Sequence, residues 1–375
     1  MKKSIALSLL AAGMLAASLS APSRATEIKA AQYLSPKHPL GAGYEVFKDV
    51  VQKESGGKIK VRVFAGGALL AAKAQSDGVR DGVADVAPLV MSYTPSYYPH
   101  GLLMGDLAMF GPNDTAATFA LSELYVMHCP GCQEDARKQN QIQLAGFSTP
   151  QYVLVGKGAM NTLETIKGKK LRAGGPLWAR FAESVGAIAV NIPSSEIYEG
   201  LSRGIIDAAM YARGGLKTHG LADVADTVSE VPLGSFRVST YFSWNLDSWK
   251  KLTPEERIIV FKGMAAGTVA MLRTYADGEK DGVALGKEKG IKFLQPDAAM
   301  TKAVDDFVEK DGQETISRWT EKGLTDAAEV VDTYKKLYRK YEALVTPIME
   351  DDEKLSELLY NEVYGKLDPK TYGVQ

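Results

Sequence analysis

Two stretches of the chain alternate strand and helix patterns in the same order, and this repetition constrains the fold more than any other feature. In the first stretch, strands are predicted at 27–34, 59–63 and 83–90, with helices at 39–55 and 72–79 between them. Strands that alternate with helices form parallel sheets whose faces the helices cover. The first stretch therefore predicts an α/β unit.

The second stretch repeats this order later in the chain. Its predicted elements are strands at 152–155, 170–173, 188–192 and 205–210, and helices at 176–185 and 194–201. Ser194 is expected to cap the last of these helices. Residues 78–87 also align with residues 200–209, each with two glycines, an aspartate and an alanine at a helix-to-strand junction. A common αβ loop with a capping glycine is the alternative explanation, but the repeated order favours two α/β lobes with a ligand cleft between them.

The first 25 residues have the features of a cleavable export signal. Lys2 and Lys3 precede an apolar run at 5–19, and Ser23-Arg24-Ala25 provides a cleavage site. The run is too short and too rich in alanine and serine to span a membrane, which takes about 20 apolar residues; an uncleaved anchor is the alternative. We expect a periplasmic chain that begins at Thr26.

Charge and composition argue against several classes of function. The formal charge is -1, and without Lys2, Lys3 and Arg24 it is about -4, which gives no reason to expect nucleic acid or an anionic membrane as a partner. Four histidines are present, and none lies in a recognisable catalytic motif. We therefore expect no enzyme, no cofactor and no metal site.

Cys129 and Cys132 are the only cysteines, separated by Pro130 and Gly131. In an oxidising periplasm they are expected to form a disulfide that holds a turn. A thioredoxin-like redox pair is the alternative, but such a pair follows a strand directly, whereas helix-like sequence at 115–127 precedes this one. A metal site with His128 lacks a second pair of ligands.

Arg172 is the strongest candidate for ligand binding. It ends a predicted strand, and Gly174, Gly175 and Pro176 open the helix that follows, with proline where no hydrogen bond is lost. A helix N-terminus attracts anions, and a guanidinium can pair with a planar carboxylate through two hydrogen bonds. The segment predicts a site for a small organic acid.

The residues around Arg172 resemble the DctP-type solute-binding proteins of TRAP transporters. The resemblance spans about 27–310. Its central part is carried by 168–172, 182–187, 193–198, Leu201 and 204–207. Its outer parts are carried by His38, Pro39, Phe47, 53–57, Ile59, Val61, Gly67, 245–249, Leu252 and Pro254.

The resemblance implies a two-lobed periplasmic binding protein fold, in which each lobe is a mixed sheet flanked by helices and a long helix spans both lobes. It assigns 26–150 and 237–280 to lobe I, 151–236 and 281–310 to lobe II, and 311–375 to a C-terminal helical extension. Such a receptor closes on an organic acid and delivers it to the sodium-coupled membrane permease subunits of a TRAP transporter. A binding protein of an ABC importer is the alternative, and a thiol oxidoreductase that uses Cys129 and Cys132 is a more remote one.

The family's carboxylate-binding arginine matches Arg172, but two polar family positions are aromatic here. A second arginine of sialate-type members falls on Tyr152, and the family's asparagine falls on Tyr211. These tyrosines predict either a smaller site or stacking on an aromatic acid; a zwitterion with a quaternary ammonium group is the alternative. Further ligand contacts are expected from Tyr93, Trp178, Trp244, Asn245 and Arg213, for which packing between elements is the competing role.

The last part of the chain, from Asp297, has a helical and charged pattern. Apolar residues recur at helical spacing at Tyr334, Leu337, Tyr341, Leu344 and Ile348. This stripe is expected to face the core or to bridge the lobes. A homodimer contact is the alternative.

Overall fold

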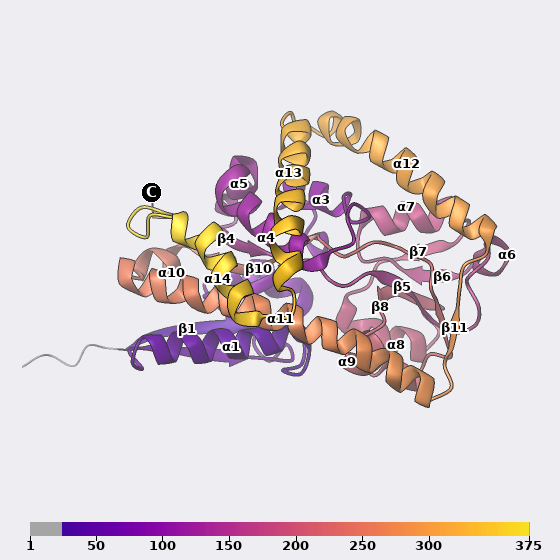
Figure 1. Ribbon diagram of the computed structural model, residues 1–375, viewed down its shortest axis with the longest axis horizontal. Coiled ribbons are helices and arrows are strands. Elements are labelled where there is room, and N and C mark those ends of the chain that lie inside the picture. The colour runs from indigo at the N-terminus through magenta and orange to yellow at the C-terminus, as the bar shows by residue number, and fades with distance from the viewer. Residues whose placement is uncertain (1–24, 375) are drawn as a thin grey trace, which may run out of the picture.

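The computed structural model describes residues 25–374 and has two lobes, each built on a mixed β-sheet (Figure 1). The expected export signal at 1–25 lies, apart from Ala25, outside the described residues. None of the described helices is long and apolar enough to cross a membrane. The two-lobed α/β fold expected from the sequence is confirmed.

The sheet of lobe I has the strand order β2-β1-β3-β10-β4. Its strands are β1 (Thr26–Ala31), β2 (Ile59–Phe64), β3 (Val86–Val90), β4 (Gln141–Gly146) and β10 (Ser239–Asn245). The first three are parallel, as the βαβαβ pattern predicts, and β10 runs antiparallel to both of its neighbours. Because β10 comes from a later part of the chain, lobe I is assembled from two segments.

The sheet of lobe II has the strand order β11-β9-β5-β8-β6-β7. Its strands are β5 (Tyr152–Gly156), β6 (Lys170–Arg172), β7 (Ile188–Val190), β8 (Ala208–Ala212), β9 (Thr227–Ser229) and β11 (Lys292–Leu294). β8 begins three residues later than predicted, because the amides of Ile205 and Ile206 both bond back to the carbonyl of Gly200. Arg172 and Ala209 are paired across β6 and β8.

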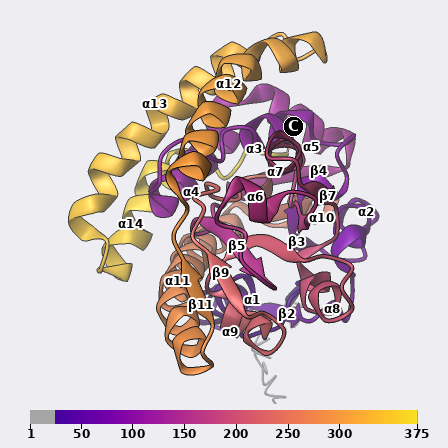
Figure 2. The same cartoon turned by 90° about the vertical axis from the view of Figure 1, so that its right-hand side faces the viewer.

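Helices cover both sheets and connect their strands (Figures 1 and 2). In lobe I they are α1 (Pro39–Glu54), α2 (Gln75–Arg80), α3 (Pro99–Gly105), α4 (Asp114–Glu123), α5 (Pro130–Lys138) and α10 (Leu246–Lys251). In lobe II they are α6 (Leu163–Ile166), α7 (Pro176–Ser184), α8 (Ile197–Ser202) and α9 (Gly215–Thr218). The expected cap at Ser194 is wrong: Pro193 precedes a short 3₁₀ turn at Ser194–Glu196, and no side chain caps it.

Helix α11 (Pro254–Glu288) is the long helix that spans both lobes. It packs on α1 in lobe I and on α9 in lobe II. Its approach to α1 is very close, since a Cβ on Gly43 would lie 2.3 Å from the carbonyl oxygen of Gly267. Its first turn is fixed by a capping box between Thr253 and Glu256.

Three C-terminal helices, α12 (Ala298–Glu321), α13 (Ala327–Val345) and α14 (Asp352–Glu362), complete the molecule. In α13, the stripe is buried at Tyr334, Leu337 and Tyr341, and the Tyr341 ring lies edge-on to Phe119 of α4 at 5.6 Å. Leu344 departs from this pattern, because 39% of its surface is exposed. The stripe is thus mainly a core face, and a homodimer through these helices stays a prediction.

The domain limits expected from the resemblance stay a prediction, and two of them fall inside helices. The limit at 280 lies inside α11, and the limit at 310 lies inside α12.

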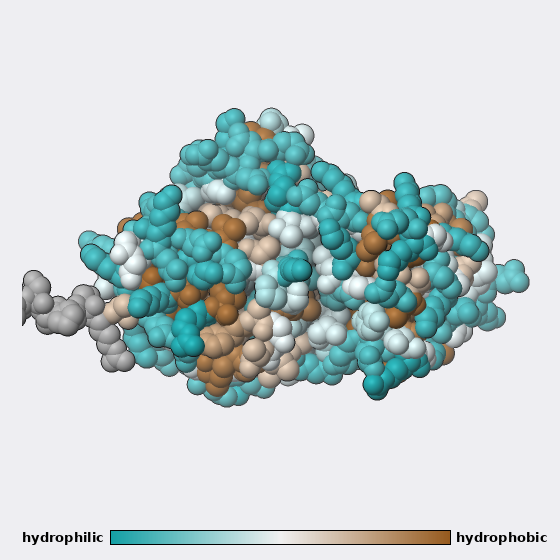
Figure 3. All heavy atoms as spheres, turned by 90° about the horizontal axis from the view of Figure 1, so that it is seen from below, coloured by the Kyte–Doolittle hydropathy of each residue, from teal (hydrophilic) through white to brown (hydrophobic). Residues whose placement is uncertain are grey.

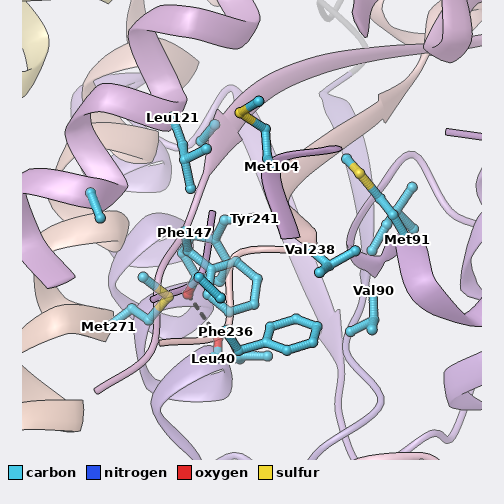
Figure 4. Packing of buried hydrophobic residues seen from close by; sticks show 14 of the residues in the cluster. Leu40, Val90, Met91, Met104, Leu121, Phe147, Phe236, Val238, Tyr241 and Met271 are labelled. Atoms are coloured by element: carbon cyan, nitrogen blue, oxygen red, sulfur yellow. Dashed lines mark hydrogen bonds between the residues drawn. The ribbon is translucent and has the colours of Figure 1, made fainter. Parts of the chain in front are cut away.

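The lobes lie side by side in an elongated molecule whose lower face carries hydrophobic patches among hydrophilic side chains (Figure 3). The chain crosses between lobes near Phe147 and Phe236, which pack with Leu40 and Tyr241 in one cluster (Figure 4). Within it, the Tyr241 hydroxyl donates to the Leu40 carbonyl at 2.8 Å.

Candidate functional site

The Arg172 side chain is buried between the lobes, and no aspartate or glutamate of the described part of the chain pairs with it. It ends β6 and is 1% exposed. Its Nε donates to the carbonyl of Ile192 at 3.0 Å, while Nη1 has no hydrogen-bond partner among the described residues. A buried charge without a counter-charge is costly, and an anion placed beside it would offset that cost.

Two glycines and a proline shape the backbone next to Arg172. A Cβ on Gly174 would lie 3.0 Å from Nη1 of Arg172, so the absence of a side chain lets the guanidinium lie against the chain. Gly175 precedes α7, and Pro176 is its first residue, as the sequence predicts. The guanidinium and the start of a helix are therefore neighbours, an arrangement that suits an anion.

Arg172 lines a narrow cavity of ≈ 20 Å³ between the lobes. This volume is well below the range for ligand sites, so the closed lobes leave little free space beside the guanidinium. The lining residues are Tyr33, Leu34, His38, Leu40, Val90, Tyr93, Phe147, Thr149, Tyr152, Arg172, Ser194, Tyr211, Phe236 and Tyr275. None of them is acidic. Five tyrosines and two phenylalanines make the wall predominantly aromatic.

The lobes touch each other at the edge of this cavity. The Ser92 hydroxyl, just after β3, donates to the carbonyl of Gly174 at 2.7 Å. The Tyr93 hydroxyl accepts a hydrogen bond from the amide of Ser194 at 2.9 Å. The structure therefore corresponds to a closed arrangement in which residues after β3 meet residues after β6 and β7.

Aromatic rings form a continuous stack on the lobe II side. The ring of Tyr152 lies 5.4 Å from that of Tyr211 and 5.4 Å from that of Trp178, which stacks on Phe236 at 5.5 Å. The guanidinium carbon of Arg172 lies 6.0 Å from the centre of the Tyr211 ring. These aromatic side chains have the size and polarity that suit stacking on a flat ligand ring.

Burial keeps the titratable neighbours of Arg172 neutral. It raises the pKa of Tyr152 to about 12, although the charge of Arg172 acts in the opposite direction. Burial, together with Arg172, lowers the pKa of His219 to about 4. Burial also lowers the pKa of His38 well below its ordinary value. At neutral pH, Arg172 is consequently the one charged side chain among those that line the cavity.

Four of the residues singled out from the sequence come together in this cavity: Arg172, Tyr211, Tyr152 and Tyr93. Trp178 does not line it. Its ring lies behind Tyr152 and Phe236, and its Nε1 donates to the carbonyl of Leu233 at 2.8 Å. Trp178 therefore supports the aromatic wall from behind.

Three further residues expected to contact the ligand do not line this cavity. Trp244 is buried on β10 and packs against Trp249 at 5.5 Å. Asn245 caps α10, accepting from the amide of Ser248 at 2.9 Å. Arg213 is paired with Glu230 and Glu279, so its charge is already offset.

Several lining residues were not identified from the sequence. Tyr33 follows β1, and its place at the carboxyl end of a parallel strand was a usable signal. His38 was noted only as part of a family motif, and it proves to be the N-cap of α1. Phe236 and Tyr275 lie in a crossing segment and in the middle of α11, where no local pattern distinguishes them from core residues.

Cys129 and Cys132 form a disulfide at the start of α5 in lobe I. Neither cysteine lines the cavity around Arg172. Helix α4 and a π-helical segment at Leu124–His128, not a strand, precede the pair. Within residues 25–374 no cluster of side chains suited to a metal ion is found.

Residues 30–318 match the family model described as bacterial extracellular solute-binding protein, family 7. A relative from Comamonas testosteroni, named outer membrane transporter protein TsaT, is 25% identical over 80% of this chain and 88% of its own.

Solved structures are similar in fold. A marine metagenome TRAP solute-binding protein, described as specific for aromatic acid ligands and solved with metahydroxyphenylacetate, has a TM-score of 0.74 at 22% identity over 84% of this chain and 99% of its own. A TRAP solute-binding protein from Rhodoferax ferrireducens T118, solved with benzoate, has a TM-score of 0.72 at 21% identity over 86% of this chain and 100% of its own. On the match of the family model, this chain belongs to the extracellular solute-binding proteins of family 7.

Proposed function

We propose that this chain is the periplasmic receptor of a TRAP transporter for a small aromatic acid, which it binds through Arg172 and delivers to a sodium-coupled membrane permease. One observation carries the proposal: a fully buried guanidinium, whose Nη1 has no hydrogen-bond partner among residues 25–374, lies at the wall of an aromatic cavity between the lobes. A carboxylate beside Nη1 would supply both the missing counter-charge and the missing hydrogen-bond acceptor.

The rest of the cavity favours an aromatic body over an aliphatic dicarboxylate. A second carboxylate would find no second cation, since Arg172 is the only Lys or Arg among the lining residues. The faces of Tyr152, Tyr211 and Phe236 instead suit a planar ring.

A zwitterionic ligand is disfavoured by the charges around the cavity. An ammonium group would lie near Arg172 with no aspartate or glutamate among the lining residues to offset it. Cation–π attraction to the tyrosines would act against the repulsion from Arg172. Two of the solved relatives were crystallised with aromatic acids, metahydroxyphenylacetate and benzoate, which supports the same ligand class here.

A thermal-shift screen of the mature protein tests the proposal. The panel contains benzoate, phenylacetate, benzenesulfonate, succinate and glycine betaine. A ligand that binds the folded state raises the unfolding midpoint as its concentration exceeds Kd. Benzoate or phenylacetate is expected to raise the midpoint more than succinate or betaine does. Stabilisation by succinate alone, or by none of the aromatic acids, would refute the aromatic assignment.

Transfer to a permease is tested in reconstituted vesicles. Membranes that contain the permease encoded beside this gene should take up the identified acid only with this receptor and with an inward sodium gradient. Uptake that requires ATP instead of sodium would favour the ABC-importer alternative.

A further inference from the structure

We propose that His38 is a specificity-determining residue that donates a hydrogen bond from Nε2 to an oxygen on the ligand's ring, so that the receptor prefers hydroxyl- or oxo-substituted aromatic acids to unsubstituted ones. This inference rests on the proposed function, because it takes Arg172 as the group that holds the carboxylate.

The first observation is that two buried nitrogen atoms in the cavity wall have no hydrogen-bond partner among the described residues. Ten side chains of the described residues carry a buried nitrogen or oxygen without a hydrogen-bond partner, and two of them, Arg172 and His38, line the cavity. The atoms concerned are Nη1 of Arg172 and Nε2 of His38. Buried polar groups are nearly always satisfied in folded proteins, and a cavity-lining exception is a candidate for a ligand contact.

The second observation fixes the position of the proton on His38. The amide of Leu40 donates to Nδ1 of His38 at 3.2 Å, because His38 is the N-cap of α1. An amide N–H can only donate, so Nδ1 is the unprotonated nitrogen. The ring is neutral, because burial holds its pKa well below the ordinary value. The single ring proton is therefore on Nε2, which makes it a donor without an acceptor.

The third observation is that His38 and Arg172 are connected through the rings of two other residues. The Arg172 guanidinium lies over Tyr211, Tyr211 contacts His219 at 4.8 Å, and His219 contacts His38 at 5.2 Å. One carboxylate is thus expected to engage Arg172 while a different group of the ligand reaches His38. That group must be an acceptor, and a phenol or carbonyl oxygen is an acceptor that a flat acid can carry.

His219, by comparison, already has neighbours for both ring nitrogens. Its Nε2 lies 3.3 Å from the Tyr211 hydroxyl, and its Nδ1 lies 3.2 Å from the Thr218 hydroxyl. The competing role for His38 Nε2 is a weak contact with a ring face, since His38 meets Tyr275 edge-on at 5.8 Å. That role predicts no dependence on ligand oxygen, which separates the two explanations experimentally.

The test measures affinities for benzoate, 3-hydroxybenzoate, 4-hydroxybenzoate and 3-fluorobenzoate by titration calorimetry. The wild-type protein is expected to bind one hydroxybenzoate about tenfold more tightly than benzoate, the gain of one buried hydrogen bond. Fluorine is a poor acceptor, so 3-fluorobenzoate should bind like benzoate. An equal gain from fluorine and hydroxyl would mean that ring size, not His38, sets the preference, and would overturn the proposal.

The variant His38→Asn keeps an oxygen that can cap α1, but the shorter side chain has no hydrogen-bond donor at the position that Nε2 occupies in the wild type. In this variant, the preference for the hydroxybenzoate is expected to fall to within about twofold, whatever happens to the absolute affinity. His128→Asn, which changes a partly exposed histidine outside the cavity, should retain the wild-type preference. A preference that survives in His38→Asn would overturn the assignment.

Failure of the proposed function has a different signature. If benzoate and both hydroxybenzoates fail to bind the wild-type protein at millimolar concentration, the aromatic receptor itself is refuted. If they all bind equally well, the receptor stands and the role of His38 is refuted.

Discussion

The hydroxyl of Ser92 in lobe I donates to the carbonyl of Gly174 in lobe II at 2.7 Å, two residues beyond Arg172 in the sequence. The segment that carries the guanidinium is therefore also a segment on which the lobes close. Ligand binding and lobe closure are expected to depend on the same few residues, because a shift of this backbone displaces both the hydrogen bond and Arg172.

Gly174→Ala should impair binding by crowding Arg172. The new methyl group would lie 3.0 Å from Nη1 and 3.4 Å from the Phe236 ring, so the guanidinium must move. We expect at least a tenfold loss of affinity for the aromatic acid, with little change in the unfolding midpoint, since only a side chain end is displaced.

Gly175→Ala is the matched control for that variant. Its methyl group would make ordinary contacts, at 3.6 Å to Trp178 and 3.7 Å to Ser92. Affinity should stay within about threefold of wild type in a parallel calorimetric titration. Equal losses in both variants would show that backbone stiffening, not contact with Arg172, is responsible.

Asp106→Asn should destabilise the packing of α12 against the two lobes. The Asp106 carboxylate is 1% exposed, accepts from Arg180 of α7 at 2.8 Å and Trp319 of α12 at 2.7 Å, and pairs with Arg318 at 3.1 Å. Losing one charge from this buried network is expected to lower the free energy of unfolding by about 2–3 kcal/mol.

Urea denaturation measures the effect of Asp106→Asn against an exposed control. Asp306 pairs with Lys302, and their side chains are 62% and 74% exposed. Asp306→Asn should change the free energy of unfolding by less than about 0.5 kcal/mol. Similar values for the two variants would contradict a structural role for the network.

Stability should fall as the pH drops from neutral toward 4, in part through His219. Its pKa is lowered to about 4 in the folded chain, by burial first and by Arg172 second, against an ordinary value of 6.5. Between pH 6.5 and 4, His219 binds a proton in the unfolded chain but stays neutral in the folded chain, so folding becomes less favourable as the pH falls. The contribution is about 1.4 kcal/mol per pH unit within that window.

The variant His219→Gln isolates this contribution. Between pH 7 and 5 it should lose about 2 kcal/mol less stability than wild type, measured by urea denaturation at both pH values. His128→Gln, at a partly exposed site, serves as the control. Parallel pH profiles of His219→Gln and the wild type would show that His219 titrates in the folded chain as it does in the unfolded one.

Removing the disulfide should leave ligand binding intact. Cys129 and Cys132 close a loop of four residues in lobe I, outside the cavity, and such a short loop contributes about 2 kcal/mol at most. With both cysteines replaced by serine, affinity for the acid should stay within twofold, because a serine oxygen at 129 can still cap α5. A loss of affinity greater than tenfold in the double variant would contradict the position of the disulfide outside the binding site.

The sequence predicted the parts of the fold and site that depend on local patterns. Arg172 was identifiable because a strand end, two glycines and Pro176 stand together in the chain. The strand and helix order also predicted the parallel part of each sheet. β10, by contrast, joins lobe I antiparallel from a distant segment, and no local pattern specifies that pairing.

Aromatic residues were harder to place, since burial in a core and burial at a site give the same local pattern. Tyr152 on β5 and Tyr211 on β8 both line the cavity, whereas Trp244 on β10 packs against Trp249 instead. Tyr275 reaches the cavity because α11 crosses both lobes, a relationship that exists only in three dimensions. Arg213 is neutralised by Glu230 and Glu279, and the chain order gives no sign of that pairing.

The most direct test of the account is the affinity of Arg172→Gln for benzoate, measured by titration calorimetry beside wild type and the exposed control Arg62→Gln. Arg172→Gln should bind at least about tenfold more weakly, the loss of one charge-assisted hydrogen bond, while its unfolding midpoint is not lowered because a buried unpaired charge has been removed. Arg62→Gln should bind like wild type. Wild-type affinity in Arg172→Gln would contradict the central claim that Arg172 holds the ligand's acid group.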